Sequence, residues 1–291
     1  MPLTERDGVS LYFKDTGEGH AILFLHEFGG DVRSWQHQVR YFSRRYRCIV
    51  TAARGYPPSD VPVDADDYGW ETSLADAVHV LDHLNIERAH VVGLSMGAYM
   101  GLMLAMRHGD RVSALAAASG GSGAYLPTRE GFIADALASA ERMQAAGALP
   151  AEGMGMAPNR VQLKIKDPLG WQEFVDHLAD HSAVGSAHTM RAVQAARPSL
   201  YDFDTELAAI AAPTLLVVGD EDDPCLDVNL HMKRIKPMAG MSVFPKSGHL
   251  LNLEDPARFN GELENFFIAA EAGRWPVRDM DADPAQVFDR D

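Results

Sequence analysis

The chain has 291 residues, of which 46% are hydrophobic and 23% are charged, a mixture typical of a large globular domain. Its formal net charge of −15 disfavours nucleic acids and anionic membranes as partners. The N-terminal segment has no basic stretch followed by an apolar run, and no apolar run approaches the length of a membrane span. We therefore expect a cytoplasmic protein. Cys48 lies in an apolar run, which favours a free buried thiol over a disulfide or a metal site.

Apolar runs along the chain predict the strands of one sheet. Several of them are continuous rather than alternating, as expected for parallel strands whose two faces are both covered. Helical spacing of apolar residues occurs between the runs, at residues 71–84 and 96–107. The predicted strands span residues 9–15, 21–26, 47–53, 89–93, 113–118, 214–219 and 241–245. This alternation indicates an α/β fold with a doubly wound, mostly parallel sheet.

The alternation of strands and helices is interrupted by a long helix-like stretch with Gly and Pro punctuation. A helical block inserted between two strands of one sheet predicts a cap over the carboxyl ends of the strands. The polar, acidic C-terminal end predicts a tail that packs at most through Trp275 and Phe288. The predicted divisions are a core in two parts (residues 1–122 and 206–272), a helical cap (residues 123–205) and a tail (residues 273–291).

The motif Gly93-Leu94-Ser95-Met96-Gly97 stands between a predicted strand and a predicted helix. In this context Gly-x-Ser-x-Gly is typical of a sharp turn that needs small flanking residues and exposes the serine hydroxyl above the sheet edge. The helix start also supplies free N–H groups and a positive dipole end. Ser95 is therefore the predicted nucleophile.

A serine hydroxyl needs a base to become nucleophilic, and the base needs an acid to orient it. Asp222 and His249 each lie in a loop that follows a predicted strand. Ligands of open α/β sheets bind at these carboxyl ends, so both side chains are placed where Ser95 is expected.

Taken together, these motifs resemble the α/β-hydrolase superfamily. The resemblance rests on VGLSMG, PTLLVVGDEDDP, SGHLLNLEDP and ARGYPPSD, and it extends over residues 8–270. It implies an α/β-hydrolase fold with an inserted helical cap. It also implies Ser95 as nucleophile, His249 as general base and Asp222, rather than the neighbouring Asp223, as orienting acid.

The same resemblance implies an oxyanion hole formed by the backbone N–H groups of Phe28 and Met96. It implies no metal and no organic cofactor. The expected partner is a small-molecule substrate, and the sequence leaves open whether the protein is a monomer or a homodimer.

The predicted activity is hydrolysis of a small-molecule ester or lactone through an acyl-enzyme, and the GLSMG run is similar to that of enol-lactonases. A carbon–carbon bond hydrolase or an amide hydrolase is an alternative on the same three residues. Carbon–carbon hydrolases usually read SMGG and carry a tryptophan soon after the histidine, whereas Ala98 and Leu250 stand at those places here. A cofactor-independent dioxygenase and a small-molecule receptor on the same scaffold are further alternatives.

The substrate pocket is the least determined part of the prediction. Tyr125, Trp171 and His188 in the cap are candidates to line it, although helix packing also explains them. Glu27 departs from the His-Gly that the family usually has after the strand ending at His26. Glu27 either bonds to the neighbouring backbone or to an arginine such as Arg33 or Arg54, or it lines the pocket beside the oxyanion hole.

Overall fold

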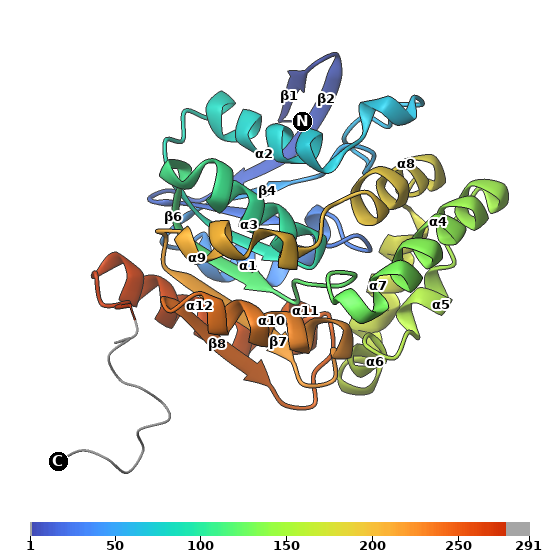
Figure 1. Ribbon diagram of the computed structural model, residues 1–291. Coiled ribbons are helices and arrows are strands. Elements are labelled where there is room, and N and C mark those ends of the chain that lie inside the picture. Colours follow the sequence, from blue (N-terminus) through green and yellow to red (C-terminus); the bar gives the residue numbers. More distant parts are fainter. Residues whose placement is uncertain (1, 278–291) are drawn as a thin grey trace, which may run out of the picture.

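A computed structural model describes residues 2–277 of the chain (Figure 1). Its centre is one eight-stranded sheet with the order β1-β2-β4-β3-β5-β6-β7-β8. Strand β2 pairs antiparallel with β1 and β4, and all other pairs are parallel. The strands are β1 (Leu3–Arg6), β2 (Val9–Thr16), β3 (Ala21–Leu25), β4 (Arg47–Thr51), β5 (Ala89–Leu94), β6 (Val112–Ala118), β7 (Thr214–Gly219) and β8 (Ala239–Phe244).

The seven predicted strands are all present, with ends that differ by at most two residues. Strands β3, β5 and β7 are buried along their whole length, which explains their continuous apolar sequences. Strand β1 was not predicted. It is a short, polar edge strand in which Thr4 alone is buried, so it has no apolar run to reveal it.

Helices cover both faces of the sheet. Helix α3 packs on β3, β5 and β6, and it contacts α2 and α9, which lie beside it. Helices α1 and α12 contact each other and pack on β4 and β6, respectively. The helices of the core are α1 (Gln36–Phe42), α2 (Trp70–His83), α3 (Met96–Arg107), α9 (Asp204–Ala209), α10 (Asp223–Ile235), α11 (Leu251–Glu254) and α12 (Pro256–Glu271). The predicted doubly wound fold is confirmed.

The stretch between β6 and β7 is helical and forms a group beside the sheet, in green to yellow on the right of Figure 1. It contains α4 (Arg129–Ala146), α5 (Ala151–Gly155), α6 (Val161–Lys166), α7 (Pro168–Ala179), α8 (Ala183–Thr189) and the π-helical turn η5 (Met190–Ala195). Helix α4 packs on α8 and η5, and α7 packs on α5 and α6. We call this group the cap segment.

Residues 272–277 follow α12, and Trp275 among them lies against the start of β8. Trp275 packs edge-on against Phe266, with ring centroids 4.7 Å apart, and its indole N–H donates to the Met238 carbonyl at 2.9 Å. This agrees with the predicted contact of the tail through Trp275, whereas Phe288 lies outside the described residues. Within residues 2–277, no helix is long and apolar enough to cross a membrane.

Candidate active site

Ser95 occupies a strained turn between β5 and α3. Its φ is 53° and its ψ is −108°, a conformation that L-residues rarely adopt. The flanking glycines make the turn possible, because a Cβ at Gly93 would overlap the Gly97 carbonyl and a Cβ at Gly97 would overlap the Leu25 carbonyl. The Ser95 N–H donates to the Ala118 carbonyl at 2.8 Å, which fixes the turn against the end of β6.

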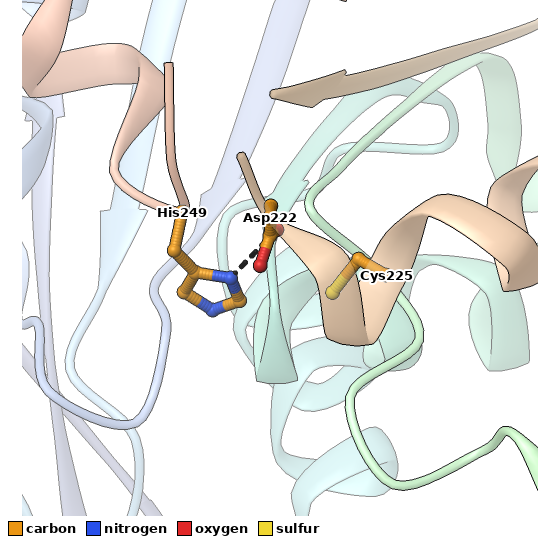
Figure 2. A group of neighbouring side chains, drawn as sticks. All are labelled: Asp222, Cys225 and His249. Carbon is orange, nitrogen blue, oxygen red and sulfur yellow. Dashed lines mark hydrogen bonds and ion pairs between the residues drawn. The ribbon is translucent and has the colours of Figure 1, made fainter. Parts of the chain in front are cut away.

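Asp222 and His249 form a buried hydrogen-bonded pair (Figure 2). Asp222 follows β7 and His249 follows β8, and the His249 Nδ1 lies 2.8 Å from the Asp222 Oδ2. Burial alone would raise the pKa of Asp222. The charge of His249 and the hydrogen bonds from His249 and Asn159 outweigh burial, so the pKa of the Asp222 carboxyl is lowered below its ordinary value.

The other carboxylates of the β7 loop face different partners. Asp220 accepts a hydrogen bond from the Ser247 N–H at 3.2 Å, and Glu221 accepts from Gln162 at 2.8 Å. Asp223 is exposed at the start of α10. Asp222 is thus the carboxylate of this loop that the structure places against His249.

Cys225 adds a third buried side chain next to this pair, as Figure 2 shows. Ligand-type atoms of Asp222, Cys225 and His249 lie within 4.8 Å of one another, a spacing that could suit a metal ion. However, the Cys225 thiol donates to the Ser119 carbonyl at 3.2 Å, and burial raises its pKa well above the usual range. A protonated thiol beside an already bonded pair fits packing better than cation binding.

Of the predicted oxyanion-hole residues, Met96 directly follows Ser95, and Phe28 lies in the loop after β3, the strand next to β5. Within residues 2–277, neither the Phe28 N–H nor the Met96 N–H donates to another residue. The Phe28 carbonyl accepts a hydrogen bond from the Tyr56 hydroxyl at 3.0 Å. His26 secures the start of the same loop, because its Nε2 accepts from the Ala53 N–H at 3.0 Å and its Nδ1 lies 2.7 Å from the Glu27 carbonyl.

Glu27 is only 1% exposed and bonds to an arginine of the cap segment. Its Oε2 accepts from the Arg160 Nη2 at 2.6 Å. The expected partners Arg33 and Arg54 are both wrong, because Arg33 pairs with Asp31 and Asp180, and Arg54 pairs with Asp76.

The two glycines after Phe28 make room for the Glu27 side chain. A Cβ at Gly29 would approach the Glu27 Oε1 to 2.8 Å, and a Cβ at Gly30 would approach the Glu27 Cγ to 3.3 Å. Burial would raise the pKa of Glu27, but the charges of Arg160 and His249 lower it by more. We call residues 26–30, which carry the predicted oxyanion donor Phe28, the oxyanion loop. The Glu27 carboxylate therefore stays ionised between this loop and the cap segment.

The three pocket candidates of the cap segment have contacts of their own. The Trp171 indole N–H donates to the Gly155 carbonyl at 2.9 Å, inside the cap segment. The His188 ring packs on the Tyr68 ring at a centroid distance of 5.0 Å. Tyr125 is half-buried against the core. No hydrogen bond within the described residues joins any of the three to Ser95 or His249.

A small cavity of about 50 Å³ lies behind the oxyanion loop. His26, Met96 and Gly97 contribute to its lining, whereas Ser95, Asp222 and His249 do not. Its volume suits a few water molecules rather than an organic substrate.

Sequence reasoning missed Asn159 of the cap segment. Its side-chain amide donates to the Asp222 Oδ1 at 3.1 Å, and its carbonyl accepts from the His249 N–H at 2.6 Å. The stretch GMAPNRVQ carries no pattern that would reveal these contacts, since Asn159 and Asp222 are 63 residues apart in the chain.

Comparison with known proteins places this arrangement in a family. Residues 20–256 match the family model described as the alpha/beta hydrolase fold. The chain is 29% identical to 3-oxoadipate enol-lactonase 1 of Acinetobacter baylyi, over 88% of this chain and 92% of the relative. It is 27% identical to the 2-hydroxy-6-oxononadienedioate/2-hydroxy-6-oxononatrienedioate hydrolase of Paraburkholderia xenovorans, over 91% of this chain and 93% of the relative.

Among solved structures, a thermophilic esterase from Thermogutta terrifontis superimposes with a TM-score of 0.81 and 25% identity, over 92% of this chain and 97% of the esterase. The family match covers most of the chain, and the full-length relatives are named hydrolases. The resemblance inferred from the motifs is thereby confirmed: the chain belongs to the alpha/beta hydrolase fold family and is an enzyme of the hydrolase class.

Proposed function

We propose that the enzyme hydrolyses a small-molecule ester or lactone, with Ser95 as nucleophile, His249 as general base and Asp222 as orienting acid. The observation that carries the proposal is the pairing of two features at one sheet edge. A serine is held in a strained turn at the end of β5, and a buried imidazole–carboxylate pair follows β7 and β8.

In the proposed mechanism, His249 takes the proton of the Ser95 hydroxyl through its Nε2 while the serine oxygen attacks the substrate carbonyl. The N–H groups of Phe28 and Met96 donate to the oxyanion of the tetrahedral intermediate, each contributing about 2.7–4 kcal/mol. The intermediate expels the alcohol, which receives its proton from His249. A water molecule then gives a proton to His249 and attacks the acyl group, which releases the acid and restores Ser95.

Asp222 stays ionised throughout the proposed cycle and stabilises the imidazolium. Its lowered pKa supports this role, because a carboxylate that is ionised at every working pH can accept the His249 Nδ1–H in each step. Because the His249 Nδ1 is bonded to Asp222, the Nε2 is free to accept the proton of Ser95.

The choice of an ester or lactone draws on the similarity to an enol-lactonase and to an esterase. Carbon–carbon bond hydrolysis is the second candidate, because the Paraburkholderia relative is named for a dienedioate substrate at a similar level of identity. The two candidates share Ser95, Asp222 and His249 and differ in the bond that the substrate presents.

The decisive experiment combines covalent labelling with turnover. A fluorophosphonate should label wild-type protein at Ser95, and Ser95→Ala should be neither labelled nor active. Ser139→Ala, which removes a half-buried serine of α4, should behave like wild type. Rates for p-nitrophenyl acetate, dihydrocoumarin and a 2-hydroxy-6-oxo-dienoate then separate the ester, lactone and carbon–carbon candidates. Failure of the fluorophosphonate to attach to Ser95 overturns the proposal.

A further inference from the structure

The part of the cap segment from Ala157 to Lys166 lies over the loops that carry the proposed acid and base. We call residues 157–166 the docking arm. Within residues 2–277, all polar side-chain contacts between the cap segment and the loops after β7 and β8 come from this arm. The docking arm therefore contacts the loops that carry Asp222 and His249 directly.

Asn159 contacts both members of the imidazole–carboxylate pair. Its amide occupies the Asp222 Oδ1, the oxygen that does not face His249. Its carbonyl receives the backbone N–H of His249. Gly248 permits this approach, because a Cβ there would overlap the Asn159 carbonyl. One residue of the arm thus fixes the acid through its side chain and the base through its backbone.

Arg160, the next residue, reaches in another direction and binds the oxyanion loop. Its guanidinium lies 2.6 Å from Glu27, and the two side chains are 14% and 1% exposed, respectively. Glu27 directly precedes Phe28, the proposed oxyanion donor. In an ion pair that is this well buried, loss of one partner leaves an uncompensated charge. The pair therefore constrains where the Phe28 N–H points.

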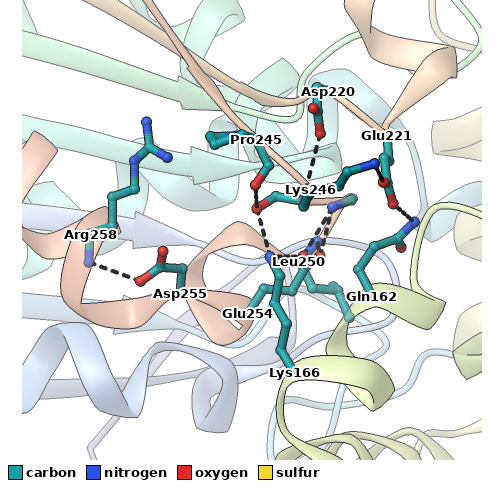
Figure 3. Close-up of polar contacts among 12 residues, drawn as sticks. Gln162, Lys166, Asp220, Glu221, Pro245, Lys246, Leu250, Glu254, Asp255 and Arg258 are labelled. Atoms are coloured by element: carbon teal, nitrogen blue, oxygen red, sulfur yellow. Dashed lines mark hydrogen bonds and ion pairs between the residues drawn. The ribbon is translucent and has the colours of Figure 1, made fainter.

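Two further contacts support the arm from its far end (Figure 3). The Gln162 amide donates to Glu221 at 2.8 Å. The Lys166 ammonium donates to Glu254 at 3.0 Å. Glu254 in turn accepts from the N–H groups of Gly248 and Leu250, the residues on either side of His249. Each loop with a proposed catalytic group after β3, β7 and β8 therefore has a bond to the arm.

We propose that Asn159 and Arg160 are positioning residues for hydrolysis: Asn159 orients the Asp222–His249 pair, and Arg160, through Glu27, orients the oxyanion loop. This inference rests on the proposed function of Ser95, Asp222 and His249. It assigns part of the catalytic geometry to the cap segment, which is otherwise expected to shape only the substrate pocket.

Asn159→Ala tests the first half, with p-nitrophenyl acetate as substrate. Loss of the amide donor should lower kcat about 10- to 100-fold, because a misplaced base is costly, and change KM by less than about twofold. The rate of fluorophosphonate labelling at Ser95 should fall with kcat. Gln172→Ala is the matched control, since its amide donates to the Asp176 carboxylate at 2.8 Å on an exposed face of α7. That control should match wild type.

Asn159→Asp tests the contact through the pH dependence of activity, which would not change if Asn159 were only structural. An ionised aspartate facing Asp222 repels it, whereas a protonated one can donate as the amide does. Asn159→Asp should therefore be more active relative to wild type at pH 5 than at pH 8. Equal relative activity at both pH values contradicts the assigned contact.

Arg160→Met and Arg160→Lys test the second half. Arg160→Met should lower kcat about tenfold or more, and Arg160→Lys should restore part of it by keeping the charge. The double variant Glu27→Gln/Arg160→Met should be at least as active as Arg160→Met, because no buried carboxylate is left unpaired. Arg191→Met is the control, because Arg191 bonds to Gln144 within the cap segment.

The outcomes separate this inference from the proposed function. If Ser95 is not labelled in wild type, the proposed function fails. If Ser95 is labelled and the Asn159 and Arg160 variants match their controls in kcat, only the positioning role fails. If these variants lower the melting temperature while kcat per folded molecule equals that of wild type, the arm is structural and the inference is overturned.

Discussion

The candidate active site has two sides that are held in place by different means. On the sheet side, backbone geometry places Ser95, and the strand ends place Asp222 and His249. On the cap side, side-chain bonds of Asn159 and Arg160 make the contact. The sheet side follows from short local motifs. The cap side depends on pairs of residues that lie 63 and 133 positions apart in the chain.

Because the two sides are held differently, they should tolerate different kinds of amino-acid substitution. A backbone arrangement at van der Waals contact has no room for added atoms, so a single methyl group disrupts it. A side-chain contact can be weakened in steps and restored by a conservative replacement. We therefore expect all-or-none effects on the sheet side and graded effects on the cap side.

The largest effect is expected for Gly97→Ala on the sheet side. The new Cβ would overlap the Leu25 carbonyl, so α3 would have to move away from β3. We expect a loss of stability of about 3 kcal/mol or more, or no folded protein. Urea unfolding followed by circular dichroism measures this. Gly261→Ala in α12, where a Cβ meets nothing within 4 Å, should instead stabilise by about 0.4–1 kcal/mol.

The next largest effect is expected for Asp222→Asn. An amide in this place donates to His249 and favours the wrong imidazole tautomer, so kcat should fall about 10⁴-fold while the fold is kept. Asp223→Asn, one residue further on and exposed, is the control and should leave kcat within about twofold of wild type. A larger loss for Asp223→Asn than for Asp222→Asn, measured with p-nitrophenyl acetate, would identify the wrong carboxylate as the acid.

On the sheet side, a buried ion pair of Asp76 can be compared with an exposed ion pair of Asp15. Asp76 of α2 is buried and accepts from Arg54 at 2.9 Å and from Arg6 at 2.9 Å. Arg54 begins the loop whose Tyr56 hydroxyl bonds to the Phe28 carbonyl. Asp76→Asn leaves the buried Arg54 without its partner carboxylate, whereas Arg6 keeps its ion pair with Asp7 at 3.1 Å. The loss of the buried pair should cost about 3–5 kcal/mol in the free energy of unfolding.

The control for Asp76 is Asp15→Asn. Asp15 pairs with Arg47 at 2.7 Å, but both side chains are about 30% exposed, so this pair should contribute less than about 1 kcal/mol. Equal losses of stability in the two variants would show that burial does not set the strength of these ion pairs.

The sequence predicts the sheet side well because that side is encoded locally. Apolar runs mark the strands, and two glycines around Ser95 mark the turn. Strand β1 escapes prediction because its residues are polar, and Leu3 is exposed at 41%. Arg160, the partner of Glu27, could not be predicted for another reason. No periodicity relates Glu27 to Arg160, which lies 133 positions away, so the sequence offered no basis for choosing Arg160 over Arg33 or Arg54.

The smallest expected effect concerns pH and compares Glu27, the carboxylate that pairs with Arg160 of the cap side, with an exposed carboxylate. The pKa of Glu27 is lowered in the folded protein, chiefly because the charge of Arg160 outweighs the cost of burial. The unfolded chain therefore binds the proton more readily. Stability from ionised Glu27 is fully present above the unfolded pKa, about 4.3, and is lost as pH falls through the folded value.

Wild type should exceed Glu27→Gln in the free energy of unfolding by a constant amount from pH 7 to about pH 5, and the difference should shrink at lower pH. The pH-dependent part is about 1.4 kcal/mol for each unit by which the pKa is lowered. Glu141→Gln, at an exposed position of α4, should show little difference at any pH. A gap for Glu27→Gln that widens on acidification would mean that the carboxylate is protonated in the fold. In that case Arg160 would have no buried counter-charge, and the cap side would lack the ion pair that joins it to the oxyanion loop.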